Sequence, residues 1–291
     1  MATTYSPSGR YSPLSFALFA VTLVTAIPLI ATAYAYAIWY VPFVYLNAIF
    51  AILMGIGTSY VVNTLVVKLG KVRRNSLASK FSLAGALAAL YVHWAVWIDL
   101  VVNSKNTGGL SAIGIPNSSI DAGQIVGLVL SPGTLLALVG KISEMGTWGI
   151  RGIVPSGVPL ILIWLIEAVI IVAIPVMLSK MVSRKPFCET TRKWFKEEEL
   201  PAYRFIEDAA AFRASLEILE VSPLAGMVRT DSIESDHCIV TRYTAPASPH
   251  CYLTVCNKRA RLNDKGQTEF DDEVLADLVR ARGINKGVVM G

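Results

Sequence analysis

The stretch GVPLILIWLIEAVIIVAIPVMLS, from Gly157 to Ser179, is apolar throughout except for one carboxylate, Glu167, near its centre. Hydrocarbon about 30 Å thick is crossed by a helix of roughly 20 apolar residues, so this stretch predicts a membrane span. An ionised carboxylate at that depth costs about 3 kcal/mol or more. Glu167 is therefore expected to be paired, protonated, hydrated or turned toward protein.

Three further stretches of the chain meet the same length and polarity criterion. The four predicted spans cover residues of about 14–35, 44–67, 81–102 and 158–178. The first contains Pro28, which predicts a kink. The mean hydropathy of +0.53 and the charged fraction of 16% agree with a membrane protein. We therefore expect a membrane all-α bundle of four transmembrane helices over residues 14–182.

The distribution of charge predicts how the bundle is oriented. Residues 1–182 carry 10 Lys and Arg against 4 Asp and Glu, whereas residues 183–291 carry 16 against 17. The basic residues gather between the second and third spans, at Lys68, Lys71, Arg73, Arg74 and Lys80. The positive-inside rule then places the N-terminus (residues 1–13) and the C-terminal domain (residues 183–291) in the cytoplasm. We expect a multi-pass protein of a bacterial inner membrane, in contact with lipid and not with nucleic acid.

The outer connection, residues 103–156, contains an additional apolar segment. Ser131 and Pro132 are typical of a helix start, and Gly146 is typical of a helix end. This helix is too short to span alone, which predicts an interfacial or re-entrant helix. A fifth span, from about Ile120 to Val139, is an alternative that would place the C-terminus outside.

The C-terminal residues 183–291 predict a small α+β soluble domain. Residues 193–220 have a helical pattern interrupted at Pro201, whereas residues 236–243 and 250–259 are rich in β-branched and aromatic residues typical of strands. A turn is expected at 263–266. Residues 273–282 predict a short helix that is capped by Asp271 or Asp272 and stopped by Gly283.

Two ionisable residues at similar depth form the first candidate site. His93 lies near the middle of the third span as Glu167 does in the fourth, so we expect them to form an intramembrane polar pair. Such a pair acts either as an interhelical hydrogen bond or as part of a proton or ion pathway, unless the two residues do not meet. Asp99 is an additional polar residue, nearer the outer surface.

Small residues at spacing of four predict close helix packing. Gly55 with Ser59, and Gly85 with Ala89, occupy such positions in the second and third spans. Packing within the chain is the ordinary interpretation, and contact with a second copy or a partner helix is the alternative. A homo-oligomer or a protein partner is therefore expected.

A metal site and a cofactor have little support in the sequence. The weak candidate ligands are Cys238, Cys251, Cys256, His237 and His250. Adjacent His and Cys residues on a strand point to opposite faces, so few of them can share a site. We expect no metal and no cofactor. No nucleotide-binding or hydrolase motif occurs, and the chain is not expected to be an enzyme.

Three functional hypotheses follow from these patterns. The favoured one is a non-enzymatic anchor or scaffold subunit of a larger membrane complex, with a cytoplasmic tail that binds a partner. The alternative is a small transporter, channel subunit or proton-responsive sensor that uses His93 and Glu167. The third is a membrane enzyme, which only the Cys and His cluster of the tail favours.

Overall fold

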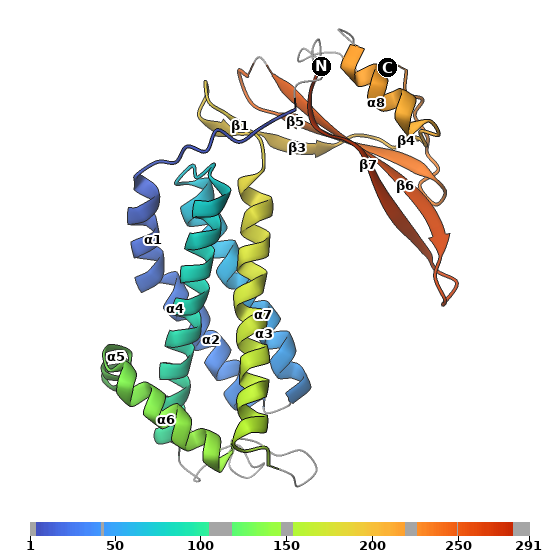
Figure 1. Ribbon diagram of the computed structural model, residues 1–291. Helices are drawn as coiled ribbons and strands as arrows, with labels where there is room; N and C mark the ends of the chain where they lie inside the picture. Colours follow the sequence, from blue (N-terminus) through green and yellow to red (C-terminus); the bar gives the residue numbers. More distant parts are fainter. Residues whose placement is uncertain are drawn as a thin grey trace. The chain divides into compact units, whose positions relative to one another are not determined.

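The computed structural model describes residues 4–41, 44–104, 118–146, 154–218, 226–248 and 250–281. The chain divides into two compact units (Figure 1). The helical unit consists of Gly9–Ser183, and the sheet unit consists of Met1–Ser8 together with Arg184–Gly291. Each unit is described by itself.

The helical unit contains four segments that are long and apolar enough to cross a membrane, as the sequence predicted. They are Leu14–Tyr40, Leu46–Lys68, Asn75–Val102 and Val158–Ser183. Its helices are α1 (Leu14–Val24), α2 (Ala26–Tyr40), α3 (Val44–Val61), the π-helix η1 (Val62–Lys68), α4 (Asn75–Val102), α5 (Ala122–Leu130), α6 (Pro132–Met145) and α7 (Val158–Ser183). The expected spans are therefore present as helices, extended by a few residues at several ends.

Proline affects the first and last of these segments differently. The first is broken at Thr25, between α1 and α2. Pro28 lacks an N–H and its ring crowds the carbonyl four residues earlier, at Val24, so the helix breaks there. The hydroxyl of Thr25 also donates to the carbonyl of Val21 at 2.7 Å, a local bond that helps bend helices. Pro175 lies inside α7 without ending it.

The long helices run alternately in opposite directions, so both chain ends of the helical unit lie at the same end of the bundle. Backbone hydrogen bonds join Ser12 to Gly70 and Arg73 to Arg10, next to the start of α1. Ser82 of α4 contacts Ser179 of α7 at this end. The apolar core between the helices includes Ile27, Met54, Val62, Phe81 and Ile171, all nearly inaccessible to solvent.

The sheet unit is built around one antiparallel sheet in the order β3-β5-β6-β7, with β4 pairing on the same side of β5 as β3. Its strands are β1 (Phe187–Cys188), β2 (Lys193–Trp194), β3 (Lys196–Glu199), β4 (Tyr203–Arg204), β5 (His237–Thr244), β6 (Cys251–Leu262) and β7 (Thr268–Ala281). The predicted strands at 236–243 and 250–259 are therefore confirmed. The predicted turn is confirmed too, with Gly266 at a φ of 71°.

Two helices that the sequence predicted in this unit are wrong. Residues 193–204 form strands β2, β3 and β4, and only Ala209–Ile218 (α8) is helical. Lys196–Glu199 is a run of helix-forming residues, but its backbone pairs with β5, and tertiary pairing overrides local propensity.

The second wrong prediction is the helix at 273–282, because residues 273–281 belong to β7; Arg282 and the expected stop at Gly283 lie outside the described residues. The buried residues of β7 are Leu275, Ala276, Val279 and Ala281, a spacing that imitates a helix. The cause is irregular pairing with β6: the register shifts near Val255, and Leu278 adopts a φ of 48°. An irregularity of this kind breaks the two-residue period on which strand recognition depends.

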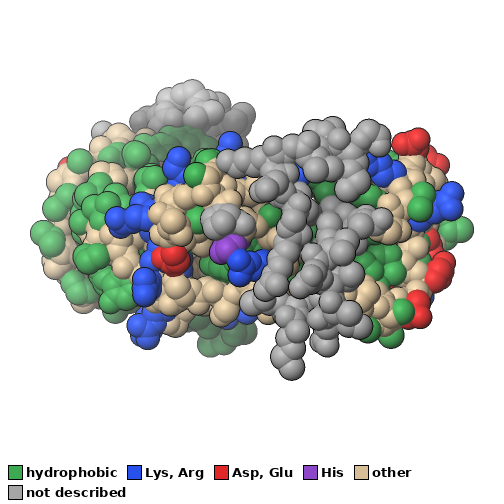
Figure 2. All heavy atoms as spheres, turned by 90° about the horizontal axis from the view of Figure 1, so that it is seen from above, with side chains coloured by type: hydrophobic (Ala, Val, Ile, Leu, Met, Phe, Trp, Pro, Cys, Tyr) green, Lys and Arg blue, Asp and Glu red, His purple; other side chains and the backbone are tan. Residues whose placement is uncertain are grey.

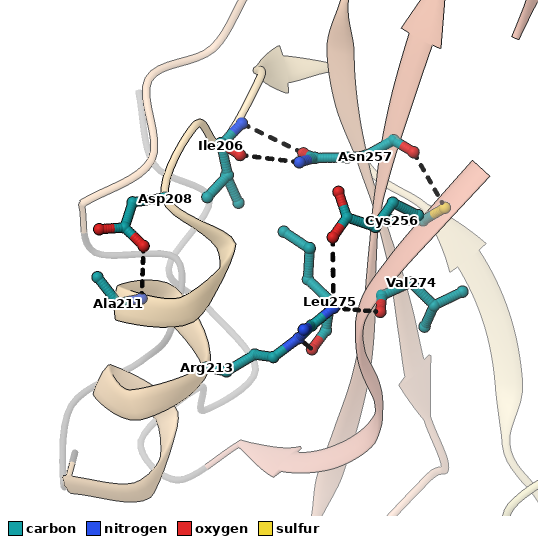
Figure 3. A network of polar contacts seen from close by, with 9 residues as sticks. Ile206, Asp208, Ala211, Arg213, Cys256, Asn257, Val274 and Leu275 are labelled. Atoms are coloured by element: carbon teal, nitrogen blue, oxygen red, sulfur yellow. Dashed lines mark hydrogen bonds and ion pairs between the residues drawn. The ribbon is translucent and has the colours of Figure 1, made fainter. Parts of the chain in front are cut away.

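Helix α8 is held against the sheet by polar contacts (Figure 3). The guanidinium of Arg213 donates to the carbonyls of Val274 and Leu275 at 3.3 Å each. The side chain of Asn257, which is fully buried, bonds both the N–H and the carbonyl of Ile206 in the segment before α8. These bonds hold α8 and the segment before it against the sheet. In the strand order of the sheet, β7 is the last strand.

The outer side of β7 is paired only at its C-terminal end among the described residues. Thr4 forms an antiparallel bridge with Val279, and the N–H of Tyr5 donates to the carbonyl of Leu278 at 2.9 Å. The edge from Thr268 to Asp277 pairs with no described strand. Charged side chains of both signs lie on β6 and β7 here, and they include the ion pair of Lys258 with Asp272 at 2.6 Å. Figure 2 shows basic and acidic side chains on the face of the molecule that is seen from above.

Candidate functional site in the helical unit

Two aromatic side chains with polar atoms meet inside the helical unit. Tyr34 of α2 and His93 of α4 are each only 4% exposed, and their ring centroids lie 4.7 Å apart in an edge-to-face arrangement. The Tyr34 hydroxyl and both ring nitrogens of His93 have no hydrogen-bond partner. Leaving a buried polar group unpaired costs about 1–3 kcal/mol, so three such atoms in one place are unusual in a stable interior.

Glu167 of α7 approaches the same place from a third helix. It is partly buried, and its carboxyl group interacts electrostatically with Tyr34. No hydrogen bond or ion pair joins Glu167 to His93, because both His93 nitrogens lack a partner. The structure therefore does not form the direct bond expected from the sequence. Glu167 lies one helical turn after Trp164, whose ring contacts Trp94, the neighbour of His93 in α4. We call Tyr34, His93 and Glu167 the Tyr–His–Glu site.

Tryptophan rings line the site toward the outer end of the bundle. Trp94 lies beside His93, with 5.3 Å between ring centroids. Trp94 in turn makes edge-to-face contacts with Trp97 of α4 and Trp164 of α7, at 5.6 and 4.8 Å. This aromatic cluster packs α4 against α7 one turn away from Glu167. The Tyr–His–Glu site thus has polar atoms at its centre and apolar rings on one side.

Asp99 was expected near the outer surface, but it is a buried residue with hydrogen-bond partners. It is completely buried, accepts a hydrogen bond from the Asn103 side chain at 2.9 Å, and accepts another from the backbone N–H of Asp121 at 3.0 Å. The carboxylate of Asp121 caps the start of α5 by accepting from the N–H groups of Gly123 and Gln124. Asp99 therefore ties the beginning of α5 to the last turn of α4.

The far end of α5 is anchored near the middle of α4. The hydroxyl of Tyr91 donates to the carbonyl of Val129 at 2.8 Å. Asp99 and Tyr91 are eight residues apart, about 12 Å along a helix, and the nine residues of α5 span about 13 Å. Helix α5 therefore runs beside α4 from its end back toward its middle.

Helix α6 returns from this point to the start of α7. The α5–α6 pair is bent by 104° at Ser131, and the N–H of Gly157 donates to the carbonyl of Ser143 at 2.7 Å. Gly146 ends α6 at a φ of 79°, as its position in the sequence predicted. The pair is thus a bent helical pair whose two ends lie at the end of α4 and the start of α7. The described chain has no straight helix over the alternative fifth span, residues 120–139, and its bent pair is either a broken span or a re-entrant hairpin.

A buried hydrogen-bond network that the sequence did not reveal lies at the opposite end of the bundle. The Asn63 side chain of η1 donates to the Ser59 hydroxyl at 2.9 Å, and the Ser179 hydroxyl donates to the Asn63 carbonyl oxygen at 2.8 Å. Ser82 completes it by a short contact with Ser179. We call Ser59, Asn63, Ser82 and Ser179 the Ser–Asn network. The only available signal was the position of Asn63 and Ser179 in apolar runs.

The small residues singled out from the sequence lie at contacts within the chain. A methyl group on Gly55 would come within 3.1 Å of Ile174 in α7, and one on Gly85 within 3.1 Å of Val62 in η1. Ala89 is completely buried in the same core. Ser59 is 2% exposed and belongs to the Ser–Asn network. These residues therefore bring α3, α4 and α7 close together inside one molecule.

The Cys and His residues of the sheet unit are not gathered into a ligand set. Among the described residues, no group of three or more His, Cys, Asp or Glu is arranged to hold a metal. His250 contacts Arg280, and His237 bonds the carbonyl of Ser235. Burial raises the pKa of the Cys238 thiol to about 12, which disfavours the thiolate that zinc requires.

Cys251 and Cys256 are the remaining candidate metal ligands of the sheet unit. Cys251 pairs with Ala281 on β7, whereas Cys256 pairs with Ile239 on β5. Burial raises the pKa of both thiols as well. All four cysteines of the chain, including Cys188, are free thiols.

No family model, no curated protein and no solved structure matches this chain. The Tyr–His–Glu site can donate, accept and exchange protons, whereas the Ser–Asn network is closed on itself.

Proposed function

We propose that this chain is a multi-pass integral membrane protein that acts as a non-enzymatic anchor or scaffold subunit of a larger complex. The observation that carries the proposal is the division of the chain into a unit with four apolar candidate spans and a separately folded sheet unit. In this proposal the helical unit holds the protein in a bacterial inner membrane, and the sheet unit binds a partner in the cytoplasm.

Basic residues support this orientation. Lys68, Lys71, Arg73 and Arg74 occur where η1 connects to α4, at the same end of the bundle as Arg10. Clusters of Lys and Arg next to spans are retained on the cytoplasmic side and attract anionic lipid. With four spans, both termini of the helical unit belong on that side.

The α5–α6 hairpin fits the same arrangement as a re-entrant element of the outer leaflet. Its inner face packs on α4 through Leu128, Leu135 and Ile142, whereas Leu130 and Leu136 on its outer face are 76% and 68% exposed. Large exposed apolar side chains on both helices favour contact with lipid or with another membrane protein. The bend between α5 and α6 is irregular backbone, which is tolerated at membrane depth only where protein covers it. A second protein packed on the outer face of the hairpin would supply that cover, which agrees with a subunit of a complex.

The partner surface that the sheet unit offers is the outer edge of β7 before Val274, which pairs with no strand of the described chain, whereas Arg213 already binds the carbonyls of Val274 and Leu275. Unpaired strand edges bind extended segments of other chains by adding a strand. The edge carries Val274, which is 51% exposed, and Phe270, which is 36% exposed, among acidic residues. The acidic residues of this edge are paired with Arg213, Lys258 and Arg261, so the complementary match is an extended partner segment that adds a strand through its backbone.

Co-purification of the tagged full chain from native membranes in mild detergent tests this proposal. We expect stoichiometric partners with the wild type and their loss with Val274→Lys, which adds a charge to the β7 edge. The matched control is Val228→Lys, at a similarly exposed valine away from that edge in the sheet pairing. A clean homo-oligomer, unchanged by either substitution, would contradict the scaffold proposal.

A second candidate function has one specific observation in its favour. The three unpaired polar atoms of Tyr34 and His93, close to Glu167, are the kind of group that lines a polar pathway or senses protons. This favours a small transporter, channel subunit or proton-responsive sensor. Flux and pH-response assays on the protein in liposomes test it, with Glu167→Gln expected to abolish the response while the protein stays folded.

A further inference from the structure

We infer that the Tyr–His–Glu site binds water inside the helical unit and, through that water, takes up one proton. The inference deepens the second candidate function and rests on it for its biological use. Its test measures binding and titration instead of transport, so that the two can fail separately.

The ligand follows from what the unpaired atoms require. A neutral imidazole has one N–H that donates and one bare nitrogen that accepts, and a tyrosine hydroxyl can do both. His93 and Tyr34 are each 4% exposed, so bulk solvent does not serve these atoms. Water is the small molecule that donates and accepts at once, and a buried water typically makes about three hydrogen bonds to such groups.

Glu167 makes the site able to hold a proton as well as water. It enters from α7 and interacts electrostatically with Tyr34, while His93 lies against Tyr34 on α4. A proton taken up from solvent converts the carboxylate to a carboxyl group or the imidazole to an imidazolium. In this proposal the bound water passes the proton between the two groups, and no further reactant is needed.

Few other charged groups face this place. Helix α3 has no charged residue over Val44–Val61, and neither does α1 or α5 over its helical residues. On α4, Asp99 is held by Asn103 and Asp121, and on α6 both Lys141 and Glu144 are exposed. Titration of the site is therefore a property of His93 and Glu167, with Tyr34 as the link between them.

The sign of one stability change tests whether water is bound. If the site were dry, Tyr34→Phe would remove an unpaired hydroxyl and raise the melting temperature. If water is bound, the substitution removes a hydrogen bond to it, and we expect the melting temperature in lipid nanodiscs to fall by about 2–4 °C. The matched control is Tyr60→Phe, because Tyr60 is 70% exposed and should change little. A rise for Tyr34→Phe would overturn the inference.

Tryptophan fluorescence of the same nanodisc samples tests the proton. Trp94 lies 5.3 Å from His93, and an imidazolium quenches indole emission more than a neutral imidazole does. We expect a pH-dependent emission change that disappears in His93→Phe and moves along the pH axis in Glu167→Gln. Trp94→Phe, which removes the reporter, should also abolish it. An emission change that all three variants retain would refute the proton site.

The proton site and the transport function can be tested separately. A protein that shows this titration but no flux keeps the site and loses the transport function. A variant that does not fold is replaced by His93→Gln, which keeps a side chain with a donor and an acceptor but does not titrate. His93→Gln should retain the melting temperature of the wild type within the error of the Tyr60→Phe control and should lose the emission change.

Discussion

The helical unit contains two buried polar clusters of similar size that differ in whether their hydrogen bonds are made. In the Ser–Asn network, Ser59, Asn63, Ser82 and Ser179 satisfy one another across three helical segments. In the Tyr–His–Glu site, the Tyr34 hydroxyl and both His93 nitrogens have no partner. A closed network needs nothing from outside and fixes packing, whereas an open one requires a ligand. On this difference we propose a structural role for the Ser–Asn network and a functional one for the Tyr–His–Glu site.

The largest effect is expected where a side chain would force the closed network apart. Gly85→Leu adds bulk where a single methyl group would already lie 3.1 Å from Val62, so α4 and η1 must separate. Overpacking costs up to about 3 kcal/mol, and the lost network bonds add to it. The check is the unfolding free energy in mixed detergent micelles. Gly127→Leu is the control, because a methyl group there meets nothing within 4 Å.

A smaller loss is expected from removing the centre of the closed network. Asn63→Ala deletes two hydrogen bonds and leaves the Ser59 and Ser179 hydroxyls with fewer partners. The bond to Ser179 joins two spans, whereas the bond to Ser59 lies within one. Since each buried hydrogen bond contributes roughly 1 kcal/mol, the unfolding free energy should fall by about 2 kcal/mol. Thr25→Ala, which removes an exposed hydroxyl bonded within its own helix, should have a much smaller effect. Equal losses in both variants would mean that the network does not stabilise the bundle.

Tyr91 differs from Tyr34 because its hydroxyl has a hydrogen-bond partner. Tyr91→Phe removes the bond to the Val129 carbonyl and should cost about 1 kcal/mol. Because that bond anchors the bend of the α5–α6 hairpin, hydrogen exchange should speed up in α5 and α6 and stay unchanged in α7. If α5 and α6 exchange at the same rates in the variant as in the wild type, the hairpin is held by its apolar contacts alone.

How far the sequence predicted these regions depends on the range of the interactions involved. The four spans and the ends of α6 were predictable, because apolar runs, Ser131-Pro132 and Gly146 act locally. The Ser–Asn network was not, because its partners lie up to 116 residues apart in the chain. Tyr34 was missed for the same reason: only the packing of α2 on α4 brings its ring to His93.

The sheet unit shows the opposite kind of failure, in which local patterns misled. The spacing of buried residues in β7 follows from irregular pairing with β6 and not from a helix. The charged strand β3 is helix-forming by composition, yet Glu198 pairs with Arg242 across the sheet at 2.7 Å. Both cases show that pairing partners, which the sequence does not identify, decide between helix and strand.

The smallest effect is expected at the starts of α5 and α6. They differ as the Ser–Asn network and the Tyr–His–Glu site do, because the side-chain hydrogen bonds are made in one and not in the other. Asp121 caps α5 with two hydrogen bonds to backbone N–H groups, whereas the side chain of Ser131 makes no capping bond to α6. Ser131→Ala should therefore change the unfolding free energy by no more than about 0.5 kcal/mol. Asp121→Ala should cost about 1 kcal/mol in the same assay, because it loses a made cap. If Ser131→Ala proved as costly as Asp121→Ala, the Ser131 hydroxyl would make a stabilising bond to α6 in the folded protein, and the difference between the two helix starts would not hold.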